Sequence, residues 1–340
     1  MKRTILYVVL AFIVAPIFVS CYQSHKKKLD LAYALVESRP DSALALMKHI
    51  DQEGLSKEEM AKYALTYYIA QDKSGLDLDN DSLIRIAYDW YESHQEDSLY
   101  VLCLNYMGKF YLLVDSMEQA KSCLEKAYFI SDSLHKMNVK RLVLDKLIEV
   151  EEQLEPYKAL RYAKDMLKMY DSMANVTIYN KVAARLRLGE NFFYVGSLQH
   201  ALEEERKAYR MAMKAGDSNL LSYVRQNLAS TFEEMGEKDS CLYYARLAYD
   251  LNAANRFSCL LTFASAYISV DSLNQAFSLL NQALPKTAED RYSVFYFQSQ
   301  AAMKAQDFKS AKSFSDSAYH YLEDMYRTAL QGKAAYYTSF

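Results

Sequence analysis

The amino-acid sequence predicts an all-α protein, a right-handed α-solenoid of antiparallel helix pairs. Only 8 of its 340 residues are glycine and 4 are proline, whereas averages are roughly 7% and 5%. So few turn-forming residues argue against a sandwich or barrel with many tight turns. Apolar side chains make up 51% of the chain, and they recur at helical spacing in a repeated unit. No low-complexity linker divides the sequence, so one solenoid domain is expected over residues 29–333.

Residues 1–20 have the tripartite form of a secretory signal peptide. Two basic residues precede an uncharged run over residues 4–19, and Ser20 and Cys21 follow it. The run is too short to favour a membrane-spanning helix. These residues resemble a bacterial lipoprotein signal, in which the cysteine becomes the new N-terminus and its sulfur carries the lipid.

The lipoprotein resemblance implies that Cys21 is lipidated and that residues 21–28 are a tether. Because Tyr22 rather than aspartate follows the cysteine, the resemblance implies sorting to the outer membrane. No acidic cluster follows Cys21, which implies a protein that faces the periplasm. Ordinary cleavage and an uncleaved anchor stay open, since the three lysines at 26–28 would suit an anchor.

Residues 29–100 show helical patterns of less regular length. A short helix is expected from Leu29, and a second begins at Pro40, where the missing N–H of proline is harmless. Apolar residues at helical spacing predict further helices over residues 60–70 and 82–93.

A longer unit then repeats, beginning near residues 101, 140, 182, 222, 257 and 292. Three copies share Val, then Asp or Gly, then Ser, with Ala four residues after the Ser, over residues 114–120, 195–201 and 270–276. In two of them Gln lies three residues after Ser116 and Ser272, which predicts a capping box at the start of the second helix.

Small residues recur at positions 8, 20 and 27 of the unit, where two antiparallel helices can approach closely. Position 8 is Gly108, Gly189, Ala229 and Ala264; position 20 is Ala120, Ala159, Ala201, Cys241, Ala276 and Ala311. The pattern resembles the tetratricopeptide repeat. A cysteine at the signal end followed by Tyr-rich repeats is also similar to the periplasmic sensor half of regulators that continue through a membrane helix to a helix-turn-helix. A tail is expected over residues 334–340.

The residue patterns of common catalytic and metal sites are missing. No two glycines are closer than seven residues, which excludes a Gly-x-Gly-x-x-Gly loop, and no His pair has the spacing of a zinc helix. Cys103, Cys123, Cys241 and Cys259 are interpreted as buried thiols rather than disulfides. The pairs Glu151-Glu152 and Glu233-Glu234 are interpreted as a solvated acidic rim, because adjacent helical residues point about 100° apart. We therefore expect a protein that is not an enzyme, with no cofactor and no metal.

In the tetratricopeptide repeat, positions 2, 5, 9, 12 and 13 of the first helix line the concave face. The resemblance therefore implies a partner-binding surface that includes Asn105, Lys109, Glu190, Phe193, Tyr194, Tyr223, Gln226 and Tyr296. Phe193 and Tyr194 are expected beside Tyr223 and Gln226 on successive first helices. Exposed tyrosine is favoured in protein recognition surfaces.

The sequence favours a membrane-tethered interaction scaffold that binds a peptide or protein. A net charge of −3 gives no basic footprint for nucleic acid. A detached periplasmic sensor of a signalling or transcription-regulatory system is one alternative. A glycan-binding outer-membrane lipoprotein is another, although a single Trp argues against aromatic sugar platforms.

Overall fold

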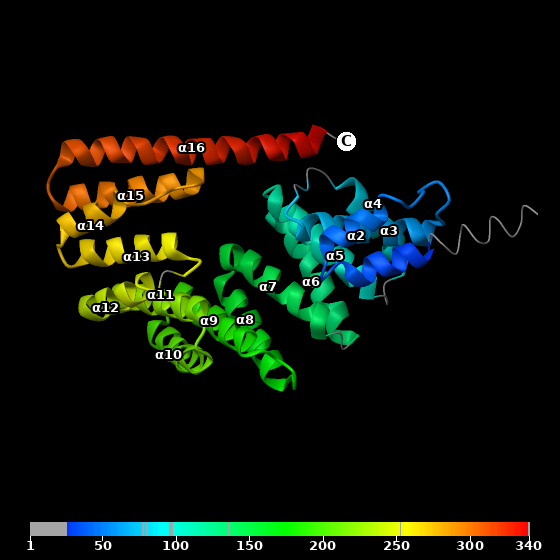
Figure 1. The fold of residues 1–340 in the computed structure, drawn as a ribbon, viewed down its shortest axis with the longest axis horizontal. Helices are drawn as coiled ribbons and strands as arrows, with labels where there is room; N and C mark the ends of the chain where they lie inside the picture. Colours follow the sequence, from blue (N-terminus) through cyan, green and yellow to red (C-terminus); the bar gives the residue numbers. More distant parts are fainter. Residues whose placement is uncertain are drawn as a thin grey trace, which may run out of the picture. The chain divides into compact units, whose positions relative to one another are not determined.

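The computed structural model describes residues 26–76, 78, 81–94, 98–134, 137–251 and 253–338, with backbone alone at 138 and 329–338. Every regular element in these residues is an α-helix, which confirms the predicted all-α class (Figure 1). The signal peptide and Cys21 lie outside the described residues. The chain divides into two compact units, residues 1–146 and 147–340, and each is described by itself.

The first unit begins with a helix over residues 26–35. This helix includes the lysines at 26–28 that were assigned to the tether, because lysine is a good helix former. The next helix begins at Pro40, as predicted. The unit continues with α2 (Pro40–Met47), α3 (Lys57–Lys73), α4 (Ser82–Glu92), α5 (Ser98–Leu113) and α6 (Met117–Ser133).

Helix α7 (Met137–Leu154) carries the boundary between the two units. The second unit continues with α8 (Pro156–Ser172), α9 (Ile178–Tyr194), α10 (Leu198–Ala215), α11 (Ser218–Glu234), α12 (Lys238–Tyr249), α13 (Arg256–Ser269), α14 (Leu273–Leu280), α15 (Ala288–Lys304) and α16 (Phe308–Thr338). Helix α16 extends through residues 334–338 of the predicted C-terminal tail, where Ala334 and Ala335 favour helix.

The helices form pairs in the predicted repeat register. We call the first helix of each repeat the A helix (α5, α7, α9, α11, α13, α15) and the second the B helix (α6, α8, α10, α12, α14, α16). The small residue at position 20 of the B helix is buried in all six repeats: Ala120, Ala159, Ala201, Cys241, Ala276 and Ala311. A side chain larger than these would separate the paired helices, so the small residues fix how closely each pair packs.

Five A helices end in the same left-handed turn at position 15. The backbone φ there is 53° at Asp115, 74° at Gly196, 74° at Gly236, 62° at Asp271 and 60° at Gln306. The N–H of the next residue donates to the carbonyl of position 11, over 2.8 Å from Ser116 to Tyr111 and 2.9 Å from Ser272 to Tyr267. This Schellman arrangement pairs carbonyls that the helix end would otherwise leave without a partner.

The capping boxes predicted at Ser116 and Ser272 are wrong. Both residues lie at the N-cap of a B helix, but neither side chain makes a capping hydrogen bond. Their backbone ψ angles, 68° and 59°, differ from the extended ψ of 165° at Ser56, whose side chain does cap α3. The shared Val-Asp/Gly-Ser pattern therefore records the end of the A helix, not a side-chain cap on the B helix.

Substitutions at position 15 are expected to change stability through the backbone alone. Nothing lies within 4 Å of where a Cβ on Gly236 would be, so Gly236→Ala should lower the free energy of unfolding by about 1 kcal/mol, the cost of a left-handed non-glycine residue. Gln306→Gly should raise it by a similar amount. Urea unfolding followed by circular dichroism measures both, and changes of the same sign would contradict the turn assignment.

Candidate interaction surface

The thiols of Cys103, Cys241 and Cys259 are buried, and that of Cys123 is half-buried. The four cysteines in the described residues form no disulfide, which agrees with the prediction. Burial raises the pKa of the Cys123 thiol to about 11 and that of Cys241 to about 12. A thiolate is the reactive form of cysteine, so neither residue is placed to act as a nucleophile. No cluster of potential metal ligands occurs in the part of the chain that the structure describes.

Successive A helices of the second unit are joined by side-chain hydrogen bonds. Asn191 Nδ2 donates to Glu152 Oε1 over 2.9 Å, linking α9 to α7. Asn227 Nδ2 donates to Glu190 Oε1 over 2.9 Å, linking α11 to α9. In each bond, the donor's position within its repeat is three lower than the acceptor's position within the preceding repeat. We call this series, with the two bonds described next, the A-helix ladder.

The A-helix ladder continues from α11 to α13. Gln226 Nε2 donates to Ser258 Oγ, and Ser265 Oγ donates to Glu233 Oε1 over 2.7 Å. The side-chain oxygen of Gln226 also accepts from Asn255 Nδ2 over 2.9 Å. These half-buried polar bonds hold the A helices in a fixed register, because leaving such groups unpaired would cost free energy.

Several residues assigned to partner binding already have structural roles. Glu190 and Gln226 belong to the A-helix ladder. In the first unit, Asn105 is buried, so its side chain is not available at the surface. Lys109 in that unit forms an ion pair with Asp72 of α3. The resemblance placed these residues by repeat position alone, and it could not show that neighbouring residues bond to them or bury them.

The three tyrosines assigned to partner binding remain exposed on A helices of the second unit: Tyr194, Tyr223 and Tyr296. Phe193 is half-buried, and its ring meets the Tyr194 ring edge-on at 6.0 Å. Burial and the nearby carboxylates of Glu152 and Glu190 raise the pKa of Tyr194. The phenol therefore stays protonated and can donate a hydrogen bond to a ligand.

Tyr194 and Tyr223 do not form one patch as predicted. Tyr194 is the last residue of α9, whereas Tyr223 lies in the second turn of α11. The A-helix ladder sets Tyr194 level with Thr231, which is eight residues beyond Tyr223. At 1.5 Å of rise per residue, the two tyrosines are about 12 Å apart along the helix axis. A ligand that touches both must therefore be extended.

The acidic pair Glu151-Glu152 is not a solvated rim. Glu151 is fully buried and its Oε1 lies 3.0 Å from Lys158 Nζ. Glu152 is mostly buried and belongs to the A-helix ladder. In the second pair, Glu234 is exposed, as expected, but Glu233 is half-buried and bonded to Ser265. Contacts between repeats, which the sequence pattern does not contain, explain the difference.

Glu205 is a buried residue that the sequence analysis missed. It lies at position 24 of its repeat, where other repeats have Leu124, Ala245 and Leu280. Its side chain is 1% exposed, and Thr231 Oγ1 donates to its Oε1 over 2.7 Å. Burial raises the pKa of this carboxyl to about 7. A charged residue at a position that holds only Leu, Ala or Ser in the other repeats was the signal that could have identified it.

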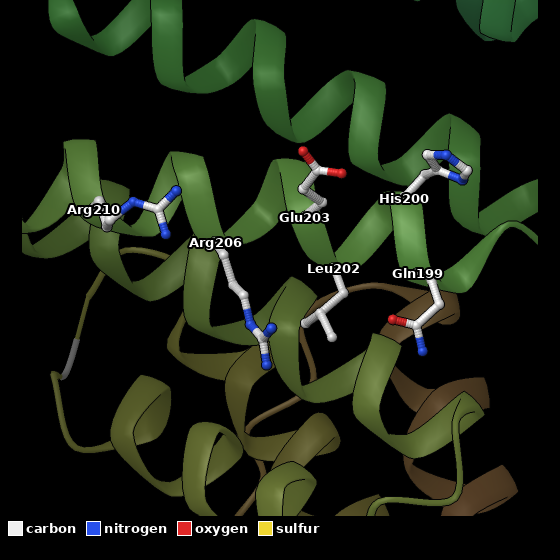
Figure 2. Close-up of a pocket in the computed structure, with 6 residues that line it drawn as sticks. All are labelled: Gln199, His200, Leu202, Glu203, Arg206 and Arg210. Carbon is white, nitrogen blue, oxygen red and sulfur yellow. The ribbon is translucent and has the colours of Figure 1, made fainter.

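A hollow on α10 does not have the form of an active site. It encloses about 340 Å³ and is lined by Gln199, His200, Leu202, Glu203, Arg206 and Arg210. Figure 2 shows that all six come from this one helix and that they do not converge on a common point. Arg206 lies over the Phe232 ring at 6.0 Å, so it also packs against the next repeat.

Solved structures of low sequence identity share this fold. The apo form of RapI matches with a TM-score of 0.63 and 12% identity, over 89% of this chain and 99% of that one. A Rap protein complexed with Competence and Sporulation Factor matches with a TM-score of 0.62 and 15% identity, over 92% and 94%. A signal transduction ATPase from Pyrococcus horikoshii with a tetratricopeptide repeat sensor matches with a TM-score of 0.59 and 14% identity, over 89% of this chain and 49% of that one.

The fold is a tetratricopeptide-repeat-like α-solenoid. The predicted repeat is therefore confirmed as a fold. No family model and no curated protein matches the sequence. Among the described helices, none combines the length and the apolar character needed to cross a membrane.

Proposed function

We propose that this protein is a non-enzymatic scaffold, tethered to a membrane by a lipid on Cys21, that binds an extended peptide or protein segment along its A helices. The observation that carries the proposal is that polar side chains on these helices are hydrogen-bonded to each other, whereas tyrosines on the same helices are exposed to solvent. The A-helix ladder holds the backbone in place, while Tyr194 and Tyr223 remain exposed. A surface that is already rigid loses little conformational freedom on binding, which favours affinity.

The chemistry of the tyrosines suits a peptide ligand. A tyrosine ring offers a large apolar face and a hydroxyl that donates or accepts a hydrogen bond. The separation of about 12 Å between Tyr194 and Tyr223 corresponds to roughly four residues of extended chain. A Rap protein of the same fold is complexed with Competence and Sporulation Factor, which supports the choice of a peptide or protein as the ligand.

Removing the exposed tyrosines is expected to abolish partner capture. Native envelopes are crosslinked, and the partner that co-purifies with the wild-type chain is identified and quantified. Tyr194→Ala and Tyr223→Ala should each weaken capture by about 30-fold, the value for a hot spot of about 2 kcal/mol. Tyr243→Ala is the matched control, because Tyr243 is 59% exposed, as is Tyr194, but lies on the B helix α12.

Two outcomes of the capture experiment would contradict the proposal. In one, the Tyr194→Ala, Tyr223→Ala double variant captures as much partner as wild type. In the other, capture falls only because the variant has a lower melting temperature. Capture of a signalling protein would favour the sensor alternative, and capture of glycan in place of protein would favour the glycan-binding alternative.

The proposed lipid anchor has its own test. Metabolic labelling with palmitate should mark the wild-type chain and place it in the outer-membrane fraction. Cys21→Ser should abolish the label, because the thioether to the diacylglyceryl group needs the cysteine sulfur. A wild-type chain that is unlabelled and released with the periplasmic contents would contradict the anchor and leave the binding surface unaffected.

A further inference from the structure

Helix α16 exposes a regular row of side chains along one face. The row consists of Phe308, Lys312, Ser315, Tyr319, Leu322 and Tyr326, all of them exposed. Their spacing alternates between four and three residues, which is the spacing of a helix–helix seam. Tyr319 and Tyr326 are 67% and 66% exposed. Three large apolar side chains are thus gathered in the second half of the row, at 319, 322 and 326.

The row occupies the repeat positions that pack against the next repeat elsewhere in the chain. On α10 the corresponding residues are Leu202, Glu205, Tyr209 and Ala212, at positions 21, 24, 28 and 31. Leu202, Ala212 and Tyr209 belong to one hydrophobic cluster with Leu220 and Val224 of the next helix, α11. On α16 the same four positions are exposed. The face of α16 is therefore built for stacking, and no described helix follows α16 to cover it.

The tyrosine at position 28 receives a basic side chain from the next helix in three internal repeats. Lys140 Nζ lies 4.8 Å from the centre of the Tyr128 ring. The guanidinium carbons of Arg225 and Arg256 lie 5.8 Å and 4.2 Å from the rings of Tyr209 and Tyr249. Cations are attracted to aromatic faces at such distances. Tyr319 is the residue at position 28 on α16, so its occupant should supply an apolar stripe and a cation.

We propose that a second copy of this chain covers the row, with the two α16 helices packed antiparallel about a twofold axis near Asp324. This pairing sets Leu322 of each copy level with Tyr326 of the other. Measured along the helix axis, Arg327 of one copy then lies within about 3 Å of the levels of Tyr319 and Glu323 in the other copy. Arg327 is exposed, and its ion pairs with the described residues are long ones within its own helix, at 3.8 Å to Glu323 and 3.5 Å to Asp324.

The second copy meets both requirements of the stacking face. Its Tyr319, Leu322 and Tyr326 supply the apolar stripe, and its Arg327 supplies the cation for Tyr319. A twofold contact uses the same patch on both copies, so one complementary helix is sufficient. With three apolar side chains from each copy, the interface is smaller than the roughly 1,200–2,000 Å² of stable complexes. The dimer is therefore weak and depends on concentration.

Co-purification of two differently tagged full-length copies tests the dimer. Tyr319→Glu and Leu322→Glu, each made in both copies, place a charge in the apolar seam. His320→Glu is the matched control, because His320 is also exposed but lies about 100° around the helix from Tyr319. The amount of the second tagged copy that co-purifies with the first should fall at least tenfold, relative to wild type, in each seam variant and persist in the control.

Helical content and melting temperature should be unchanged in both seam variants, since the substituted side chains are exposed. If one variant misfolds, the result of the other variant tests the dimer. Wild-type copies that do not co-purify would overturn the proposal, including the case in which a different protein occupies α16. Co-purification that survives both seam substitutions would overturn it as well. Because neither residue lies on the A helices, a failure here leaves the tyrosine surface of α9 and α11 intact.

Discussion

Gly108→Leu is expected to lower the free energy of unfolding by about 3 kcal/mol, the upper part of the range for overpacked cores. A Cβ on Gly108 of α5 would lie 2.6 Å from Cγ of Leu124 on α6, and Leu124 is fully buried. The two helices must therefore separate, or Leu124 must leave its place. Urea unfolding followed by circular dichroism at 222 nm measures the loss.

Two further variants identify the cause of this loss. Gly108→Ala combined with Leu124→Ala should lose less stability than the two single changes added together, because the shortened residue makes room for the added methyl. Gly189→Ala should cost less, since its Cβ would meet the flexible Cγ of Glu205 at 3.2 Å. An unfolding curve for Gly108→Leu that superimposes on wild type would show that the repeat register is wrong.

The second large effect is expected at Glu205 and depends on pH. Burial raises the pKa of this carboxyl from 4.5 to about 7, so the folded chain holds the proton more tightly than the unfolded chain. The resulting stability is fully present below about pH 4.5 and is lost as pH rises to about 7. Each unit of pKa corresponds to about 1.4 kcal/mol, so the loss is about 3 kcal/mol.

Glu205→Gln removes the titration and keeps an oxygen that can accept the hydrogen bond from Thr231. The variant should therefore be more stable than wild type at pH 8 by about 3 kcal/mol and similar to wild type at pH 4. Glu203→Gln is the control, because Glu203 is exposed on the same helix. If wild type and Glu205→Gln show the same pH profile, the carboxyl does not titrate as the burial requires.

The repeat register could be predicted because small residues leave a periodic trace. Ala120, Ala201 and Ala276 recur at position 20 since a larger side chain would keep the paired helices apart, and all three are buried. The turn that ends five of the A helices was also visible, in Asp115, Gly196 and Asp271. Its meaning was misjudged, because Ser116 was read as a capping residue, although the left-handed residue before it determines the turn.

The candidate surface was only partly predictable, because it depends on contacts between repeats. Glu190 and Gln226 have the right positions, but Asn227 and Ser258 on neighbouring A helices, and Asn255 just before α13, already bond to them. Their bonding partners lie 29 to 37 residues away in the chain, and no local pattern shows which pairs will meet. Glu205 could have been found, since it is charged at a position that the other repeats fill with Leu, Ala or Ser.

Site-specific photocrosslinking tests the proposed binding surface most directly. A photoreactive phenylalanine analogue is placed at Tyr194 on α9 or at Tyr243 on α12, two side chains with the same exposure of 59%, and native envelopes are irradiated. We expect a discrete crosslinked product with one partner from position 194 and none from position 243. Equal labelling from both positions, or a product from position 243 alone, would contradict the proposal that the A helices bind the partner.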